Sequence, residues 1–504
     1  MKRVLIGTGL VAGLLLLLAA PASAQEADPV SVLGQEVNLL WIVIGAVLVV
    51  FMQAGFALVE TGFCRAKHAA HVVSTNFAIF GLGFVGFFLV GYTFMFGGYS
   101  YILPGYDFGY DTAIGSALIG SGDWVFLWKG NFALTGATAY TGAVMGFFLY
   151  MVAFMDTVAT IPTGSMAERW KWNSFVGWGL FCGAIYYPLF GAWTWGGGWL
   201  SQLGDSFDLG YGYVDFAGSG VVHAMGGIAA LAGAIVLGPR IGKYGPDGKP
   251  RTMAGHHIPM ALLGTFILLF GWFGFNAAST LAATDVRFAV VATNTAIAGA
   301  FGATIGMFWI MWRSGKPDPG MMANGMLAGL VAITAPCAFV QPWAAAVIGT
   351  IAAVIVIEGI GFWERRGVDD PVGAISVHGM GGIFGVLCVG LFADGSYGGG
   401  WNLTTGSTIA QAYAAGEPNS GVTGLFYDAS NGFQQLLCQI IGAATIVVVM
   451  GGLVYGFFKL QNALTKGGIR LSEADELAGA DVEMGVVAYP DFDLAEEEPV
   501  TTSI

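Results

Sequence analysis

The chain has 504 residues, of which 56% are hydrophobic and only 10% are charged. This small number of charged side chains cannot cover a water-soluble surface. The composition therefore excludes a soluble protein of this length and indicates an all-α polytopic membrane protein. The formal net charge of −13 gives no basis for binding nucleic acid, which requires a basic face.

The N-terminal segment has the pattern of a cleavable signal peptide. Two basic residues at its start are followed by a leucine-rich apolar run, which ends in the small residues Ala22-Ser-Ala24. That order is typical of a secretory signal and its cleavage site. We therefore expect residues 1–24 to be removed and residues 25–36 to form a short extracytoplasmic N-terminus.

Hydropathy predicts eleven membrane-spanning helices in the rest of the chain. The predicted spans are 37–62, 73–97, 134–161, 173–195, 216–238, 258–283, 287–312, 320–338, 342–363, 372–393 and 432–459. In chain order the parts are a first five-helix repeat (37–238), a cytoplasmic connecting loop (239–257), a second five-helix repeat (258–393), an extracytoplasmic loop (394–431), the eleventh helix (432–459) and an acidic cytoplasmic tail (460–504).

The basic residues predict the orientation of these spans. If the N-terminus lies outside, fifteen of the Lys and Arg residues that follow the signal segment fall on the inner side, and only Lys129 and Arg287 fall on the outer side. Such an excess is the signature of the positive-inside rule. We therefore predict a multi-pass protein of the inner (plasma) membrane with an extracytoplasmic N-terminus and a cytoplasmic C-terminus.

Two stretches, Asp215–Gly227 and Asp370–Gly382, have nearly the same pattern. Each begins with an acid, has a histidine eight residues later and has a Gly-Gly pair three residues beyond the histidine. The first stretch opens the fifth span and the second opens the tenth, so five spans separate them. An odd number of spans per unit gives the two copies opposite orientations. The sequence therefore predicts an inverted repeat of five plus five helices, followed by a final helix.

This symmetry predicts that His223 and His378 meet near the middle of the membrane. Three interpretations follow from the residues alone: the pair ligates a haem, fills the core, or lines a narrow conduit. The adjacent Gly-Gly pairs favour close helix contact over a haem cavity. Imidazole can donate and accept hydrogen bonds, and a buried ionisable side chain is costly in lipid, so we favour a conduit for a small polar molecule that crosses without net charge. Asp215 and Asp370 either cap the helix starts or contact the substrate.

Aromatic residues predict a cation site at the outer end of the conduit. Trp195 ends the fourth span at the predicted outer face. On the sixth span, helical spacing places Trp272, Phe275 and Ser279 on one face. An indole face can hold a cation, and a hydroxyl can accept its hydrogen bonds. For any single aromatic residue, packing or an interfacial belt is the alternative interpretation.

Five stretches, taken in order, resemble the ammonium transporter (Amt/Rh) family, and specifically its Amt branch. They are Met166–Arg169, Trp195–Gly198, Asp215–His223, Gly271–Asn276 and Asp369–His378, and the resemblance covers about residues 37–490. It implies a homotrimer with a separate pore in each subunit, no enzymatic activity, no cofactor and no metal site. It also implies a PII-type signalling protein as a candidate partner at the cytoplasmic tail.

The resemblance also implies roles for individual residues. From the outside inward these are the ammonium recruitment site (Trp195, Ser279, Tyr150 and Asp215), the phenylalanine gate (Phe154 and Phe275), a pore-lining indole (Trp272), the central pair (His223 and His378) and a structural acid that caps a helix (Asp370). Four positions depart from the common bacterial pattern. They are Glu60, where Tyr is frequent, Tyr150, where Phe is frequent, Gly373, where an acid is frequent, and Met484, where a His-Gly-Glu signature is frequent.

The predicted function is that of an ammonium transporter or ammonia channel. Ammonium, or its analogue methylammonium, is recruited outside and loses its proton, and ammonia then passes the histidine pair, with or without a coupled proton. Bare ammonium would meet a large desolvation cost in this apolar section. The alternatives are an ammonium sensor or receptor with little flux, and an Rh-like ammonia gas channel. Membrane lipid is the expected surrounding of the helices.

The remaining polar groups are expected to have no special role. The tail has ten acids and no Lys or Arg after Arg470, so we expect it to be solvated. Four histidines at predicted inner loops are expected to be solvated interface residues: His68, His71, His256 and His257. The five cysteines have no metal-ligand spacing and are expected to be unpaired apolar residues: Cys64, Cys182, Cys337, Cys388 and Cys438.

Overall fold

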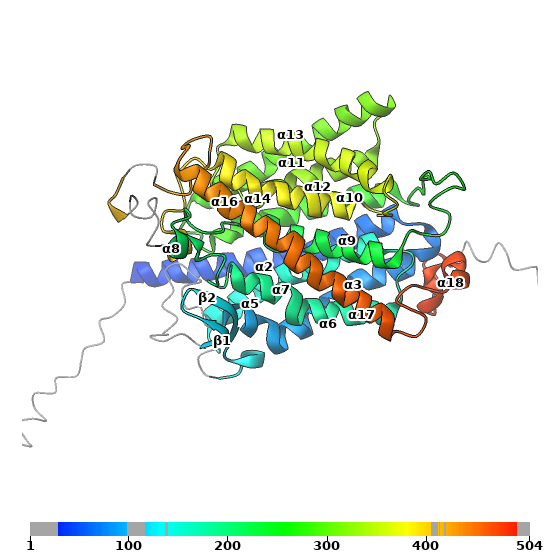
Figure 1. Ribbon diagram of the computed structural model, residues 1–504, viewed down its shortest axis with the longest axis horizontal. Helices are drawn as coiled ribbons and strands as arrows, with labels where there is room; N and C mark the ends of the chain where they lie inside the picture. Colours follow the sequence, from blue (N-terminus) through cyan, green and yellow to red (C-terminus); the bar gives the residue numbers. More distant parts are fainter. Residues whose placement is uncertain are drawn as a thin grey trace, which may run out of the picture.

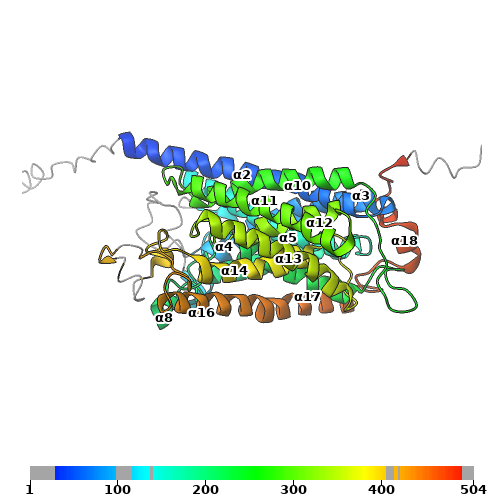
Figure 2. The same cartoon turned by 90° about the horizontal axis from the view of Figure 1, so that it is seen from above.

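The computed structural model describes residues 29–97, 116–136, 140–404, 412, 414–417 and 420–490. The predicted signal peptide lies outside the described residues, so its removal stays a prediction. Within them the chain forms a bundle whose long helices lie side by side and run along one direction (Figure 1), as the view from above also shows (Figure 2).

The elements are mostly helical. The α-helices are α2 (Pro29–Phe63), α3 (Ala69–Gly86), α4 (Tyr92–Phe96), α5 (Gly142–Met166), α6 (Trp172–Phe181), α7 (Tyr187–Trp193), α8 (Leu203–Phe207), α9 (Met225–Leu237), α10 (Ile258–Trp272), α11 (Arg287–Ser314), α12 (Pro319–Ile333), α13 (Pro342–Glu364), α14 (Gly381–Phe392), α16 (Asn431–Ala444), α17 (Gly451–Leu464) and α18 (Glu473–Ala478). Two strands, β1 (Ser116–Ser121) and β2 (Trp124–Lys129), form an antiparallel hairpin that hydropathy did not predict.

The predicted spans correspond to helices of the bundle. Among the described residues, ten helical stretches are long and apolar enough to cross a membrane, and each coincides with one predicted span. The shorter apolar helix α12 lies where the predicted eighth span was expected. The prediction of a helical multi-pass membrane protein is confirmed. The predicted start of the third span, at residue 134, is wrong: α5 begins at Gly142, because the Thr141 hydroxyl caps it by accepting a hydrogen bond from the backbone N–H of Val144.

Turns of π-helix interrupt several spans. Two of them, Ser219–Ala224 before α9 and Ile375–Met380 before α14, lie at equivalent places in the two predicted repeats. Each carries the histidine of its repeat, His223 or His378. A π-turn inside a helix often marks a functional site, because it changes the direction of the side chains around it.

The two predicted repeats cross closely at glycine residues, where no side chain separates the backbones. A Cβ added at Gly227 would overlap the backbone of Gly379, and one added at Gly382 would overlap the backbone of Ser219 and Ala224. The two other predicted contact glycines lie elsewhere: Gly226 faces α5, and Gly381 has room for a Cβ. The close crossing is therefore confirmed, but only one glycine of each pair is part of it.

Buried charges hold together the helix ends that the sequence predicts to lie on the inner side. Glu168 accepts hydrogen bonds from the backbone N–H and the guanidinium of Arg65, and it contacts the Arg240 guanidinium at 3.2 Å. Arg240 donates to both oxygens of Asp369, at 2.8 and 3.0 Å. Arg169 donates to the Asp369 carbonyl at 2.8 Å. Asp369 belongs to the predicted second repeat, Arg65, Glu168 and Arg169 belong to the predicted first repeat, and Arg240 belongs to the loop between them. This network therefore fastens the two repeats to each other.

These contacts decide the charge states of both buried acids. Burial by itself would raise the pKa of Asp369, but the positive charges of Arg169 and Arg240 and the hydrogen bonds from Arg240 lower it well below its ordinary value. Burial likewise acts to raise the pKa of Glu168, and the charges of Arg240 and Arg65 reverse that shift and lower it. Both acids are therefore ionised at neutral pH, as their guanidinium partners require.

The described part of the acidic tail, residues 460–490, docks on the predicted inner end of the bundle, as α18 beside α3 shows (Figure 1). The Asp481 carboxylate accepts hydrogen bonds from the free backbone N–H groups of Ala70 and His71 at the start of α3, at 3.1 and 2.8 Å. The backbone N–H of Ala480 donates to Nδ1 of His68 at 2.9 Å. The prediction that these residues are solvated was wrong for Asp481, His68 and His71, which are buried. Composition does not distinguish a solvated acid from one that caps a helix.

The tail also covers most of the inner histidines. His68 and His71 are buried, whereas His257 is exposed, as predicted. His256 contacts the hydroxyl of Tyr489 in the tail at 2.8 Å. Tail acid Glu476 accepts a hydrogen bond from the backbone N–H of Ile241 at 2.7 Å, so the tail touches the loop between the repeats as well. The five cysteines are buried and unpaired, which confirms that prediction.

We predict that Gly382→Ala destabilises the protein by about 1–3 kcal/mol, because its Cβ would overlap backbone atoms of the other repeat. The matched control is Gly381→Ala at the neighbouring position, where the nearest atom to an added Cβ lies at 3.6 Å. Thermal unfolding of the purified protein in detergent measures the effect. Equal midpoints for the two variants would show that the crossing does not depend on a missing side chain.

We also predict that Asp369→Asn lowers stability by about 1–3 kcal/mol at neutral pH, because the buried Arg240 loses one of its two carboxylate partners and keeps only Glu168. The folded-state pKa of Asp369 lies below its ordinary value of 3.8, so its contribution is present above that pH and is lost as the pH falls towards the lowered pKa. Unfolding midpoints of wild type and variant should therefore differ at neutral pH and begin to converge only below about pH 4. The control is Asp247→Asn, whose partner Lys249 is exposed and 3.9 Å away.

Candidate functional site

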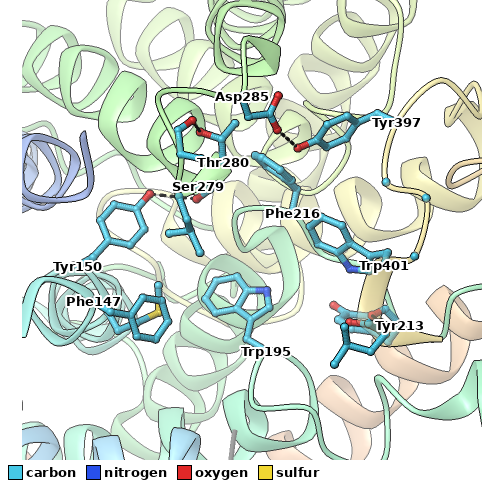
Figure 3. Close-up of a pocket in the computed structure, with 18 of the residues that line it drawn as sticks. Phe147, Tyr150, Trp195, Tyr213, Phe216, Ser279, Thr280, Asp285, Tyr397 and Trp401 are labelled. Atoms are coloured by element: carbon cyan, nitrogen blue, oxygen red, sulfur yellow. Dashed lines mark hydrogen bonds between the residues drawn. The ribbon is translucent and has the colours of Figure 1, made fainter. Parts of the chain in front are cut away.

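A cavity of about 590 Å³ opens at the end of the bundle opposite the docked tail. Nine of the 21 residues that line it are aromatic, and Trp195, Phe216 and Trp401 lie near one another in its wall (Figure 3). The side chains of Tyr150 and Ser279 lie together on one side of it. The structure thus brings three of the four predicted recruitment residues to one cavity.

Hydrogen bonds fix the polar atoms of this cavity. The indole N–H of Trp195 donates to the backbone carbonyl of Asp215 at 2.7 Å, which sets the orientation of the ring. The Ser279 hydroxyl donates to the Phe275 carbonyl at 2.7 Å and lies 3.1 Å from the Tyr150 hydroxyl. The lone pairs of these hydroxyl oxygens remain as acceptors beside several ring faces. Such a surface suits a small cation that carries hydrogen-bond donors.

Two stacked phenylalanines close the inner end of the cavity. The rings of Phe154 and Phe275 lie 4.0 Å apart with an interplanar angle of 21°, and both side chains are fully buried. The Tyr150 ring packs against Phe154 at 4.7 Å, and the Trp195 ring meets Phe154 edge-on at 5.9 Å. Phe154 and Phe275 therefore separate the outer cavity from the residues beneath them.

The predicted contact between the two imidazoles is present directly beneath this stack. Nδ1 of His223 lies 3.2 Å from Nδ1 of His378, and the two rings are nearly parallel with centroids 5.3 Å apart. His223 also stacks on Phe275 and Trp272, at 5.3 and 5.1 Å. A hydrogen bond between two Nδ1 atoms requires one of them to carry a proton and the other to accept it. The pair therefore holds a proton between its rings.

One nitrogen of the pair is left without a protein partner. Nε2 of His223 is buried and has no hydrogen-bond partner among the described residues. The indole N–H of Trp272, in contrast, is satisfied by the Thr334 hydroxyl at 2.9 Å. This nitrogen is therefore available to hydrogen-bond with a small molecule that enters the section.

The acids that begin the two duplicated stretches act as helix caps. Asp215 is buried and accepts hydrogen bonds from the backbone N–H groups of Gly218, Gly220 and Val221, at 2.8 to 2.9 Å. Asp370 does the same for Gly373 and Ile375, at 3.1 and 2.7 Å. Of the two interpretations of these acids, the structure supports capping. Asp215 reaches the outer cavity only through its carbonyl, which holds Trp195.

A second and much smaller cavity lies on the other side of the histidine pair. Its volume is about 20 Å³, and its wall includes Phe56, Glu60, Asn324, Val372 and His378. The sequence analysis noted Glu60 only as a departure from a family pattern. Nothing in the local sequence indicated that this acid shares a cavity with a histidine that is more than 300 residues away.

The sequence analysis also missed the part of the outer cavity that comes from loops. The Tyr397 hydroxyl donates to the Asp285 carboxylate at 2.5 Å, and the Arg287 guanidinium lies 5.0 Å from the centre of the Tyr397 ring. These contacts hold the loop that carries Trp401 over the cavity (Figure 3). The sequence did contain a signal for this part of the cavity. Aromatic residues flank Gly398-Gly-Gly400, in a loop to which the sequence analysis assigned no role.

Comparisons with known proteins agree with this geometry. The model of the Ammonium Transporter Family matches residues 40–489. Ammonium transporter Amt2 of Archaeoglobus fulgidus is 42% identical over 505 aligned positions, which cover 98% of each chain. Ammonium transporter Amt1 of Haloferax mediterranei is 34% identical over 93% of this chain and 82% of its own.

Solved structures are similar over nearly the same length. A protein described as a "Sensor Amt Protein" superposes with a TM-score of 0.75 at 32% identity, covering 90% of this chain and 99% of its own. Mep2 of Candida albicans superposes with a TM-score of 0.70 at 25% identity, covering 93% of each chain. The fold of the described residues is therefore that of known Amt and Mep proteins.

We predict that Asp215→Ala accelerates amide hydrogen exchange at residues 218–221 by about tenfold, because three backbone N–H groups lose their acceptor. The control is Asp318→Ala, which removes one such bond, to Met321 at the exposed start of α12, so its effect should be smaller and confined to that helix. Exchange measured by mass spectrometry on peptic fragments distinguishes the two. Unchanged protection of residues 218–221 would contradict the capping role.

Proposed function

Because the chain belongs to the ammonium transporter family, we propose that it takes up ammonium in the outer cavity, removes one proton and conducts ammonia past the histidine pair. The observation that carries the proposal is the Nδ1 to Nδ1 contact of 3.2 Å between His223 and His378, together with the unpaired Nε2 of His223. A proton-carrying pair with one nitrogen open to a visitor suits the handling of ammonium better than it suits a passive core.

Capture is assigned to the outer cavity. The faces of Trp195 and Phe154 attract a cation, with about 0.5–2 kcal/mol per contact. The hydroxyl oxygens of Ser279 and Tyr150 accept two of its N–H groups. The Asp285 carboxylate on the far wall adds negative charge to the same cavity. Ring faces, hydroxyl oxygens and a carboxylate together suit ammonium, which has a positive charge and four N–H donors.

Deprotonation follows from the barrier beneath this cavity. The Phe154 and Phe275 rings, 4.0 Å apart, leave no open passage, so one ring has to rotate before a molecule can pass. A bare ammonium ion that entered the dry section would lose its hydration without a charged partner, at a cost of many kcal/mol. Neutral ammonia avoids this cost and can still hydrogen-bond to imidazole. The chemistry of the section therefore favours the uncharged form.

The histidine pair can take the proton. In this step an N–H bond of ammonium breaks and a new N–H bond forms at Nε2 of His223. His223 then passes its Nδ1 proton to Nδ1 of His378 across the 3.2 Å contact. His378 releases its own Nε2 proton on the inner side. During these transfers the positive charge stays on an imidazolium ring that is hydrogen-bonded to the other ring of the pair.

We propose that the helices cross the plasma membrane with the outer cavity outside and the docked tail in the cytoplasm. The distribution of Lys and Arg residues supports this orientation. Large exposed apolar residues along the helices, such as Phe77 and Trp312, suit contact with lipid or with neighbouring subunits. The homotrimer with one pore in each subunit is proposed from the family resemblance. A PII-type regulator would meet the inner face formed by the docked tail and the loop after α9.

A specific observation favours one alternative function. The solved structure with a TM-score of 0.75 carries the description of a sensor, so ammonium binding with little flux is the second candidate. An ammonia gas channel of the Rh type is less favoured, because such a pore would not need the cation-binding walls of the outer cavity. Transport measurements separate these functions.

We predict that His223→Gln reduces ammonium-evoked current at least tenfold, because Gln cannot carry the transferred proton. The protein is reconstituted in liposomes, and the current is recorded on a solid-supported membrane after an ammonium jump. The matched control is His257→Gln, which changes an exposed histidine at the inner start of α10 and should leave the current within twofold of wild type.

Two results would reject the proposal. Full current in His223→Gln would exclude the histidine pair from the proton path. A wild-type protein that binds ammonium but moves neither ammonium nor methylammonium would be a sensor instead of a transporter.

A further inference from the structure

An acid without a charge partner lies on the inner side of the histidine pair. Glu60 belongs to the long apolar helix α2, and only 3% of its surface is exposed. It lines the small inner cavity together with His378. Among the described residues no Lys, Arg or His forms an ion pair with Glu60. A carboxyl group in such a place is costly, and the mechanism above does not use it.

The position of Glu60 follows from the geometry of α2. Phe56, one turn earlier, packs against His378 with ring centroids 6.2 Å apart. Residues four apart share a face of a helix and are separated by about 6 Å along its axis. Glu60 therefore lies on the same face as Phe56, one turn closer to the end at which the tail docks. A proton that leaves His378 in the inward direction meets this carboxyl group first.

The carboxyl is held by neutral donors from two other helices. The Asn76 side-chain amide of α3 donates to its Oε2 at 2.6 Å. The Thr163 hydroxyl of α5 lies 2.8 Å from Oε2 and 3.1 Å from Oε1. The titratable groups that face Glu60 are His378 across the cavity and Asp370, whose charge acts on it from the second repeat. Neutral donors orient the group and leave it free to gain or lose a proton.

The small cavity can connect the two titratable groups. A space of about 20 Å³ is sufficient for roughly one water molecule, and His378 and Glu60 are both among the residues that line it. Such a water can accept a proton from Nε2 of His378 and donate one to the carboxylate of Glu60. The path of hydrogen bonds would then extend from the outer histidine to an acid near the inner end of α2.

We propose that Glu60 is a proton-transfer residue that returns the proton to ammonia at the inner end of the pore. In its protonated form the carboxyl group gives its proton to an arriving ammonia, so its O–H bond breaks and the fourth N–H bond of ammonium forms. The carboxylate left behind is reprotonated from Nε2 of His378 through the cavity water. One ammonium ion thus enters outside and one leaves inside, while only ammonia and a relayed proton cross the dry section.

This inference rests on the proposed transport function, and it competes with a purely structural role. A structural Glu60 would only join α2 to α3 and α5 through Asn76 and Thr163. Gln is the informative replacement, because its amide oxygen can accept the same two hydrogen bonds but the group cannot exchange a proton at neutral pH. A residue that acts only as a link between helices should tolerate that change.

The test compares charge movement with ammonia movement in the same proteoliposomes. Current after an ammonium jump reports the relayed proton, and alkalinisation of a trapped pH dye reports ammonia that enters without a proton. We expect Glu60→Gln to lower the current at least tenfold and to alkalinise the vesicle interior faster than the wild type, because its ammonia enters without the relayed proton. Glu60→Asp keeps the acid and should restore a substantial part of the current.

The matched control is Glu358→Gln. Glu358 is also a carboxyl on an apolar helix, α13, but it contacts Trp309 and Arg313 and does not line the inner cavity. This variant should keep both signals within twofold of wild type. Unfolding midpoints show whether each variant is intact.

Five outcomes decide the matter. Loss of current with faster alkalinisation in Glu60→Gln supports the proposal. Unchanged current overturns it, and so does a wild-type protein that admits ammonia without any current. A parallel loss of current, ammonia entry and thermal stability in Glu60→Gln assigns a structural role and also overturns it. If the wild type moves neither species, the proposed transport function fails, and the role of Glu60 that rests on it fails with it.

Discussion

The whole arrangement depends on how closely the two repeats approach each other inside the bundle. At Gly227 and Gly382 no side chain separates the backbones, and this proximity lets two imidazoles from different repeats share a hydrogen bond. In lipid no water is available to satisfy a stranded polar group, so each histidine needs the other. A bulkier residue at the crossing would push the rings apart and leave two costly groups unpaired.

Charge is distributed along the molecule according to how well it can be compensated. At the inner end, Arg169 and Arg240 surround Asp369, and the docked tail adds acids that cap free backbone N–H groups. At the outer end, Asp285 lies beside a tyrosine hydroxyl and within reach of water. Between the two ends, Glu60, Asp215 and Asp370 are held by neutral hydrogen-bond donors. The apolar section, which excludes ions, thus lies between two ends of the protein at which charges are compensated.

The polar groups of the interior form an ordered series. Ser279 and Tyr150 accept hydrogen bonds above the phenylalanine stack, the histidine pair lies beneath it, and Glu60 lies one helical turn further inward. Each group can exchange a hydrogen bond with a molecule on either side of it. In the proposed mechanism the protein splits ammonium, which is costly to move through the apolar section, into ammonia and a proton. Each of the two then crosses by its own path.

The sequence by itself determined the positions of the spans and of the histidine pair, and it predicts the inverted repeat, because hydropathy and a duplicated motif are properties of contiguous residues. Only the tertiary structure placed Glu60 beside His378, put Trp401 over the outer cavity and docked Asp481 on α3. Those contacts join segments that are hundreds of residues apart, and local composition carries no information on which of them will meet. An acid in an apolar helix and an acid in a polar tail are both recognisable in the sequence, but their partners are decided by packing.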